Sequence, residues 1–317
     1  MGRFQRILYV ERRRRGSTRA FSCAIHTALR EGASLTVAGA ATGDRLERMA
    51  ELGSLFGVPV RRVELDRGGL PADLVSGHDL VITVGRSKGP VWPFRPGGLE
   101  RRLMRECGCP AWILHPAQSP ESRVVVAAVD VTSRAGEALS RGVLEAAGGL
   151  ADSTGAELHV VHCWSVVGES LLASRSRGGS RRGAERVLTE AARSRRRRIE
   201  GLLEAAGLGG VGRVVLCKQK VVPGLRDVAW RLEADIVVVG SVGRTGVGAL
   251  FPGNTAERLV GRVPASLFVV PADWAQAADP SPSLRRAASR SRPAVDHPWP
   301  GPGGVGWPAA SRGAGRG

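Results

Sequence analysis

Residues 240–254 contain glycines at a spacing that could bind a phosphate group. A run of strand-forming residues ends at Gly240, and Gly243 follows three positions later. Nine further residues separate Gly243 from Gly253 and Asn254, where a helix is predicted to begin. Glycine lets main-chain N–H groups approach a ligand closely, and the first turn of a helix presents unpaired N–H donors to an anion. The spacing therefore predicts a site for a di- or triphosphate that needs no lysine.

The same residues also have a purely structural interpretation. Asn254 is a favourable N-cap residue, and Glu257 three positions later completes a pattern like a capping box. On spacing alone, phosphate binding and a bare structural loop are equally compatible with the motif.

The elements around this loop alternate between strand and helix. Short apolar, β-branched runs alternate with amphipathic stretches through residues 4–271, which predicts parallel strands covered by helices on both faces. The expected strands are residues 6–11, 34–40, 60–65, 78–85, 110–116, 124–131, 157–164, 213–219, 235–241 and 265–271. The expected helices are residues 18–32, 44–57, 97–107, 133–155, 184–207, 223–234 and 254–263.

The second half of this pattern repeats the first. "HDLVITVG" matches "ADIVVVGS", and "PAWILHP" matches "PASLFVVP". The prolines and serine of "HPAQSPES" indicate a linker between two modules, residues 4–116 and 122–271. Residues 272–317 are rich in Pro, Gly, Ser, Ala and Arg and have no apolar period, so a disordered tail is predicted.

The glycine loop, the strand "VPASLFVVP" after it and "VAAVDVT" at the start of the second module resemble the universal stress protein family, in particular its tandem E-type members. The resemblance covers about residues 4–271. It implies two five-stranded parallel α/β modules of the adenine nucleotide α-hydrolase-like kind. It also implies that the two modules pair within one chain, as two copies of a single-module relative pair in a homodimer. Whether two tandem chains form a further homodimer is left undecided by the sequence.

The resemblance further implies ATP or another adenine nucleotide, with Mg²⁺, as the ligand of the second module. Its site residues would be Asp130, Gly240, Gly243, Arg244, Gly253, Asn254 and Thr255. Asp130 also fits the rule that ligands bind outside the carboxyl ends of parallel strands, but a carboxylate that caps the helix near Ser133 is an equal alternative. The family pattern has Ser or Thr where this chain has Asn254, which weakens the inference; an amide can still donate to a phosphate oxygen.

The first module departs further from the family pattern. Gly85 is retained, but Lys88 replaces the second glycine, three prolines follow it, and Glu11 stands where an Asp is expected. We therefore expect the first module to have lost any nucleotide site and to serve as a pairing partner.

Composition and charge bear on three other possibilities: nucleic-acid binding, a zinc site and a membrane span. The formal net charge is +17, almost all of it from arginine, yet no aromatic residues interleave with Arg195–Arg198, which favours a solvated helix face over nucleic-acid binding. The cysteines show no zinc-ligand spacing, and Cys107 and Cys109 are expected to be buried. No apolar run approaches the ~20 residues that span a bilayer, so a cytoplasmic protein is expected.

No nucleophile, acid–base pair or metal set is visible, so a binding or signalling module without turnover is expected. The alternative function is a scaffold that binds no nucleotide and acts through protein or non-specific nucleic-acid contacts.

Overall fold

The protein is described here from a computed structural model. The structure describes residues 3–12, 16–40, 44–65, 69–85, 98–117, 121–165, 181–241 and 255–277.

The first half of the chain alternates strands and helices and ends in a short strand. Its elements are β1 (Arg6–Val10), α1 (Ser17–Glu31), β2 (Ser34–Ala40), α2 (Asp44–Leu55), β3 (Val60–Leu65), α3 (Ala72–Ser76), β4 (Leu80–Val84), α4 (Gly98–Glu106) and β5 (Ala111–Leu114).

The second half repeats this order with longer helices. Its elements are β6 (Val124–Ala128), α5 (Arg134–Thr154), β7 (Glu157–Cys163), α7 (Arg181–Ala205), β8 (Arg213–Cys217), α8 (Val221–Arg231), β9 (Ile236–Ser241), α9 (Thr255–Leu259), β10 (Ser266–Pro271) and α10 (Ala272–Ala277).

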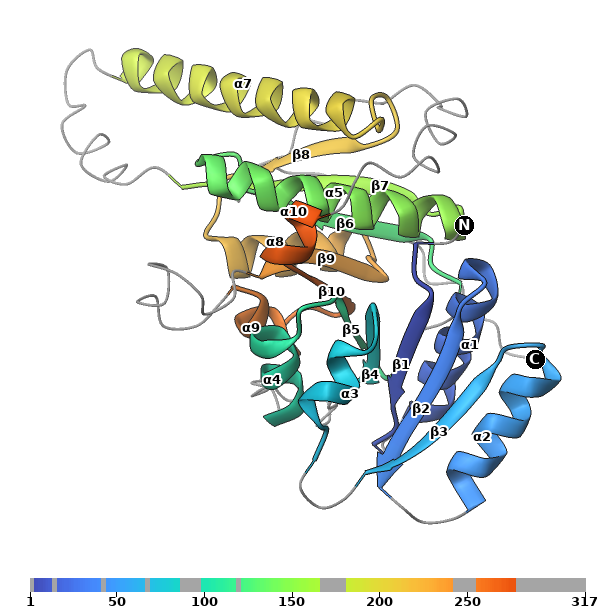
Figure 1. The fold of residues 1–317 in the computed structure, drawn as a ribbon. Helices are drawn as coiled ribbons and strands as arrows, with labels where there is room; N and C mark the ends of the chain where they lie inside the picture. The colour runs from blue at the N-terminus through green and yellow to red at the C-terminus, as the bar shows by residue number, and fades with distance from the viewer. Residues whose placement is uncertain are drawn as a thin grey trace, which may run out of the picture.

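All these strands join in one ten-stranded sheet with the order β3-β2-β1-β4-β5-β10-β9-β6-β7-β8. Neighbouring strands are parallel within each half, and the halves meet where β5 pairs with β10 in antiparallel register. Figure 1 shows the first half in blue and teal below the second half in green to orange. The predicted α/β class and the pairing of the two halves within one chain are confirmed.

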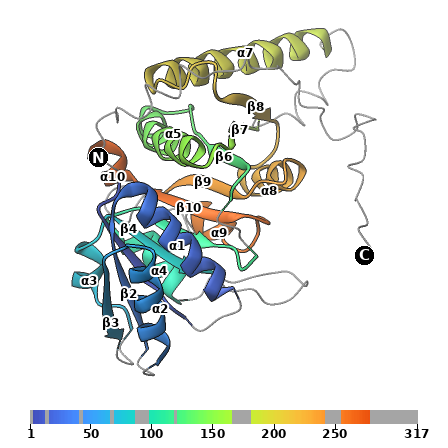
Figure 2. The same cartoon turned by 90° about the vertical axis from the view of Figure 1, so that its right-hand side faces the viewer.

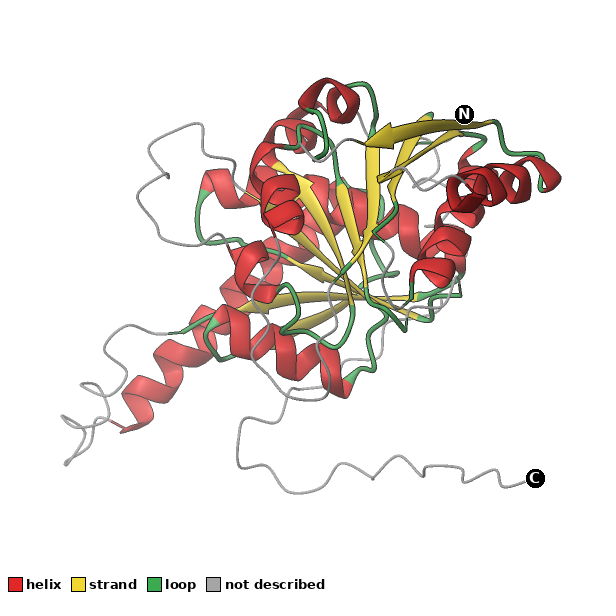
Figure 3. Cartoon of the chain, turned by 90° about the horizontal axis from the view of Figure 1, so that it is seen from below, coloured by secondary structure: helices red, strands yellow, loops and turns green. Residues whose placement is uncertain are grey.

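Helices cover both faces of the sheet (Figure 3). The continuous buried strands explain this arrangement, because a parallel strand with apolar residues on both faces must be covered twice. One buried cluster extends across both halves and includes Tyr9 and Trp112 from the first and Val125 and Phe268 from the second. The junction of the halves is therefore part of the hydrophobic core.

Local sequence signals set several helix boundaries. The side chain of Ser133 caps α5 by accepting a hydrogen bond from the N–H of Gly136 at 3.0 Å. Gly32 and Gly155 end α1 and α5 in the left-handed conformation, with φ of 66° and 69°, which a residue without Cβ adopts at little cost. The periodic apolar pattern and these caps together made the helices predictable.

Apart from shifts of a few residues at element ends, such as α7 beginning at Arg181 and α9 ending at Leu259, the described elements differ from the sequence prediction at two places. Helix α3 was not predicted, because five residues are too few to show a helical period. The folded chain also does not end at residue 271, where the tail was predicted to begin. It continues as α10, which lies against α5 (Figure 2), and Trp274 packs on the main core.

The rest of the predicted tail, residues 278–317, lies outside the described residues. Within the described part of the chain, no helix combines the length and apolar composition that a membrane span requires.

Candidate functional site

The candidate site lies at the carboxyl ends of β6 and β9, which are neighbours in the sheet. The chain leaves β6 toward β7 on one side, whereas β9 continues to β10 on the other. Such a switch point opens a crevice outside the strand ends, where open α/β sheets bind their ligands. Asp130 follows β6, and Gly240 and Ser241 end β9, so the topology brings these predicted residues to one edge.

Asp130 is exposed at this edge. Its Oδ1 accepts hydrogen bonds from the backbone N–H of Thr132 at 2.9 Å and from the Thr132 hydroxyl at 2.6 Å. Ser140 of α5 donates its hydroxyl to the Asp130 carbonyl oxygen at 3.1 Å. Ser133, and not Asp130, caps α5, so the helix-capping alternative for Asp130 is wrong. The carboxylate instead shapes the turn after β6 and has room to accept from a ligand.

Gly240 has a structural reason to be glycine. A Cβ built at this position would lie 2.4 Å from Cδ2 and Cγ of Leu139 in α5, which is far inside van der Waals contact. The missing side chain therefore lets α5 pack closely on β9. Ser241, next to it, is buried and donates its hydroxyl to the carbonyl of Met104 in α4 at 2.9 Å.

Of the predicted site residues that follow Ser241, the structure describes Thr255. Thr255 is half-buried and opens α9. The predicted site residues Gly243, Arg244, Gly253 and Asn254 lie outside the described residues, so their roles stay predictions.

Glu257, expected to complete a capping box with Asn254, is turned toward α4 instead. Both of its carboxylate oxygens accept from the guanidinium of Arg105, and the Nε of Arg101 lies 3.8 Å from Oε2. These contacts raise the pKa of Arg105, chiefly through its hydrogen bond to Glu257. The Glu257 carboxylate therefore joins α9 of the second half to α4 of the first. The local sequence around Glu257 does not predict this contact.

Three further side chains near the same edge were not predicted as site residues. His162 in β7 is buried, and its Nδ1 lies 2.9 Å from the carbonyl oxygen of Val129, so Nδ1 carries the proton. Its Nε2 is buried and has no hydrogen-bond partner among the described residues. The guanidinium of Arg195 in α7 lies 4.7 Å from the ring centroid of Trp164.

Burial lowers the pKa of His162, and the nearby charge of Arg195 lowers it further, against opposing effects of its bond to Val129 and of Asp130. The ring is therefore neutral at pH 7, with an accepting lone pair on Nε2. Nothing in the local sequence indicates that His162 lies close enough to Asp130 and Arg195 for their charges to act on it.

The corresponding edge of the first half is occupied by its own side chains. Glu11 follows β1 and is 6% exposed. Its Oε2 lies 3.0 Å from the Tyr9 hydroxyl, and its Oε1 lies 3.4 Å from Nε of Arg45 in α2. Burial and the Glu11 charge raise the pKa of Tyr9 far above its ordinary range, so it stays a neutral donor. The charge of Glu11 is therefore compensated within the protein.

Three arginines of the run Arg195–Arg198 in α7 form ion pairs within the chain. Arg196 and Arg197 pair with Glu200 and Glu190 at 3.9 and 2.8 Å, and Arg198 pairs with Glu137 of α5 at 3.1 Å. Within the described residues, no group of three or more His, Cys, Asp or Glu side chains is placed to hold a metal ion.

Cys107 and Cys109 are buried, as the sequence predicts, with their sulfur atoms 3.2 Å apart.

Comparison with known proteins is consistent with this architecture. Residues 121–271 match the model of the universal stress protein family. The chain is 27% identical over 210 residues to universal stress protein E of Escherichia coli strain K12, and the match covers 63% of each sequence. A universal stress protein of Mycobacterium tuberculosis strain H37Rv is 27% identical over 192 residues, or 59% of this chain and 60% of the relative.

Two crystal structures share the fold over most of the chain. A functionally unknown protein from Pseudomonas aeruginosa PAO1 superposes with a TM-score of 0.68 at 20% identity, covering 91% of this chain and 98% of that protein. A universal stress protein from Archaeoglobus fulgidus gives a TM-score of 0.56 at 16% identity, covering 84% and 98%. At these identities the likeness shows the fold alone.

Proposed function

This chain is a member of the universal stress protein family, and from that premise we propose that it is a stress-response binding protein whose second half holds an adenine nucleotide. The ligand is ATP or a related nucleotide, with Mg²⁺ held mainly by the phosphates. The protein acts by binding and not by turnover.

The contrast between Asp130 and Glu11 supports this proposal most directly. Both carboxylates follow the first strand of a half, at the edge where a ligand would bind. Glu11 is buried and paired with Arg45, whereas Asp130 is exposed and forms no ion pair with a described residue. Of these two carboxylates, Asp130 is therefore the one that is free to accept from a nucleoside.

The chain offers further groups that fit an adenine nucleotide. The Nε2 of His162, which has no hydrogen-bond partner among the described residues, can accept from a ligand N–H group, and its burial would make such a bond strong. Gly243 and Gly253 would present main-chain N–H groups to the phosphates, with Arg244, Asn254 and Thr255 as additional donors. In this proposal Gly240 serves the packing of α5 and only indirectly the ligand.

The first test is whether the protein binds an adenine nucleotide. Mass spectrometry of the purified full chain is expected to find a co-purified adenine nucleotide, and calorimetry is expected to show binding of ATP–Mg²⁺. Replacing Asp130→Ala should weaken binding about tenfold or more, because a hydrogen bond to a charged group contributes about 1.5–3 kcal/mol. Asp152→Ala, at an exposed carboxylate within α5, is the matched control and should leave affinity unchanged.

A second variant tests the glycine loop. Gly243→Val combined with Gly253→Val should abolish nucleotide binding by blocking close approach to the main chain. Full affinity in this double variant would refute the assignment of the loop.

The rival function, a scaffold without a nucleotide, would be favoured by absence of both the co-purified nucleotide and any calorimetric signal. A scaffold that binds nucleic acid would show a steep salt dependence that survives the glycine substitutions. The intramolecular pairing of Arg196, Arg197 and Arg198 is a reason to rank that alternative lower.

A further inference from the structure

A cavity of about 740 Å³ lies in the first half, at the amino ends of β1, β2 and β3. Its volume is in the range of small-molecule sites. Side chains from the three strands, from α3 and from the turn after α3 surround it. The polar members are Arg6, Ser34, Thr36, Arg61, Asp73 and His78. This cavity is at the opposite strand ends from the proposed nucleotide site, and it belongs to the other half of the chain.

The polar side chains gather on one face of the sheet because of strand register. Alternate residues of a strand share a face, and Leu8 and Ala38 mark the face that α3 and α4 cover. Arg6 lies beside Ser34 in register, and Thr36 lies beside Arg61. On this face the sheet is buried and apolar toward the carboxyl ends, whereas Arg6, Ser34 and Arg61 at the amino ends are exposed to solvent.

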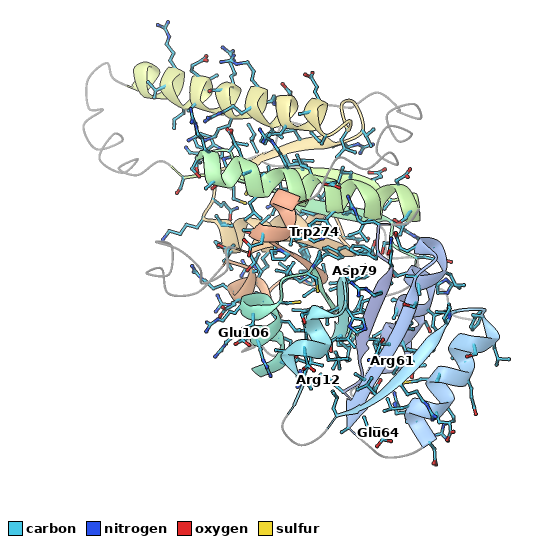
Figure 4. All side chains as sticks on the ribbon, in the orientation of Figure 1. Arg12, Arg61, Glu64, Asp79, Glu106 and Trp274 are labelled. Carbon is cyan, nitrogen blue, oxygen red and sulfur yellow. The ribbon has the colours of Figure 1, made fainter. Side chains whose placement is uncertain are left out.

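Two arginines supply positive charge to the cavity. Neither Arg6 nor Arg61 forms an ion pair with a described residue, whereas Arg62 on the opposite face of β3 pairs with Glu47 of α2 at 3.3 Å. Figure 4 labels Arg61 over the strands of the first half. The nearby carboxylate of Asp79 is occupied by the backbone N–H groups of Gln5 and Arg6, at 2.9 to 3.2 Å.

His78 fixes the inner wall of the cavity. Its Nδ1 lies 2.6 Å from the carbonyl oxygen of Leu74, so Nδ1 carries the proton, and its Nε2 accepts from the Thr36 hydroxyl at 2.8 Å. Burial lowers the pKa of His78; the Leu74 bond opposes this shift, and the charges of Arg61 and Arg6 lower the pKa further. The imidazole is therefore neutral at pH 7, and both of its nitrogens are satisfied.

The rest of the wall is apolar. Pro59, Val63, Pro71 and Leu74 line the cavity beside the arginines. A pocket with a few placed polar groups on a mostly apolar wall is typical of a site for an organic molecule, whereas a bare ion would need no such wall. Paired guanidinium groups favour carboxylate or phosphate oxygens.

We propose that this cavity binds a small organic anion, with its carboxylate or phosphate group against Arg6 and Arg61 and a short apolar body against Val63, Pro71 and Leu74. Ser34 lies within the same wall, where its hydroxyl donates to the carbonyl oxygen of Gln5 at 3.2 Å. Asp73, on exposed α3, disfavours ligands with a second negative group at the rim. Because the cavity and the carboxyl edge of the second half share no residue, this site is independent of the proposed nucleotide site.

The test is calorimetry on the full chain with hexyl phosphate and hexanoate as probes. At least one of the two should bind, and the difference between them assigns the charged group as phosphate or carboxylate. Hexanol, which lacks the charge, and inorganic phosphate, which lacks the apolar body, should bind at least tenfold more weakly. Absence of binding by both anionic probes, or equal binding of hexanol, would overturn the proposal.

Substitutions in and beside the cavity test where the anionic probe binds. Arg61→Ala should weaken probe binding about tenfold or more, whereas Arg62→Ala, its neighbour on the opposite face, should have no effect. Gly77→Phe should block the cavity; a Cβ at Gly77 meets only ordinary contacts, at 3.5 Å or more, so the fold should tolerate it. Asp130→Ala should leave probe binding unchanged. Equal losses from Arg61→Ala and Arg62→Ala, or undiminished binding in Gly77→Phe, would refute this location.

Discussion

At the scale of single residues, Gly240 shows that a glycine in a ligand motif can be required by packing. The sequence places it in a phosphate-binding pattern, and the structure places Leu139 where its side chain would lie. The two explanations predict different losses on substitution. Packing predicts lost stability, whereas ligand approach predicts lost affinity with stability unchanged.

We expect Gly240→Ala to lower the free energy of unfolding by about 1–3 kcal/mol, because the added methyl group overpacks the contact between β9 and α5. Urea denaturation measures this change. Gly201→Ala is the matched control: a Cβ there meets nothing within 4 Å, and alanine is the better helix former. A Gly240→Ala protein as stable as the parent, but with weaker nucleotide binding, would show that the ligand alone requires this glycine.

At the residue scale, only part of the candidate site could be predicted from the sequence. Asp130 was predictable because it follows a strand whose end could be located, and strand ends define the ligand edge. His162 and Arg195 were missed because the tertiary packing of β7 and α7 brings them near each other and brings His162 near Asp130. The contact of Glu257 with Arg105 was not predicted, because a local capping pattern carries no information about the other half.

At the scale of elements, periodicity predicted the long helices and the buried strands, and it failed for the short elements. Helix α10 was assigned to the tail because Ala272–Ala277 is followed by a long polar, proline-rich stretch. Its anchor is Trp274, labelled in Figure 4, which packs against the core. The guanidinium of Arg3 lies 5.6 Å from the Trp274 ring centroid. Arg3 in turn pairs with Glu145 of α5 at 2.9 Å. This contact joins the N-terminal residues, α5 and α10.

Trp274→Ala is expected to lower the free energy of unfolding by about 1–3 kcal/mol, less than a fully buried tryptophan would cost, because the ring is only half-buried. Trp230→Ala is the control on α8, where the ring is 70% exposed, and its effect should stay within about 0.5 kcal/mol. Urea denaturation of both variants tests whether α10 is a structural element. Equal effects of the two substitutions would contradict the anchoring role of Trp274.

At the scale of the whole molecule, internal repetition in the sequence predicted two similar halves but did not show how closely they join. The structure joins them by the antiparallel β5·β10 pair, by the contacts of Glu257 and Ser241 with α4, and by a shared core. Phe268 is fully buried at this junction, with ring centroids 6.0 Å from Trp112 and 6.4 Å from Phe4. An apolar junction of this kind favours one cooperative folding unit over two independent modules.

Cooperativity predicts that damage in one half reaches the other. Phe21 is buried in the first half, 5.4 Å from Tyr9 between ring centroids, so Phe21→Ala should cost about 3–5 kcal/mol. Hydrogen exchange should then become faster by the same factor in β6, β7 and β9 of the second half as in β1, β2 and β4 of the first, because all these amides exchange through one global opening. Phe56→Ala, at an exposed ring, is the control and should change neither half. Faster exchange confined to the first half would show instead that residues 4–116 and 122–271 unfold as separate domains, and the shared core would then be an interface between them.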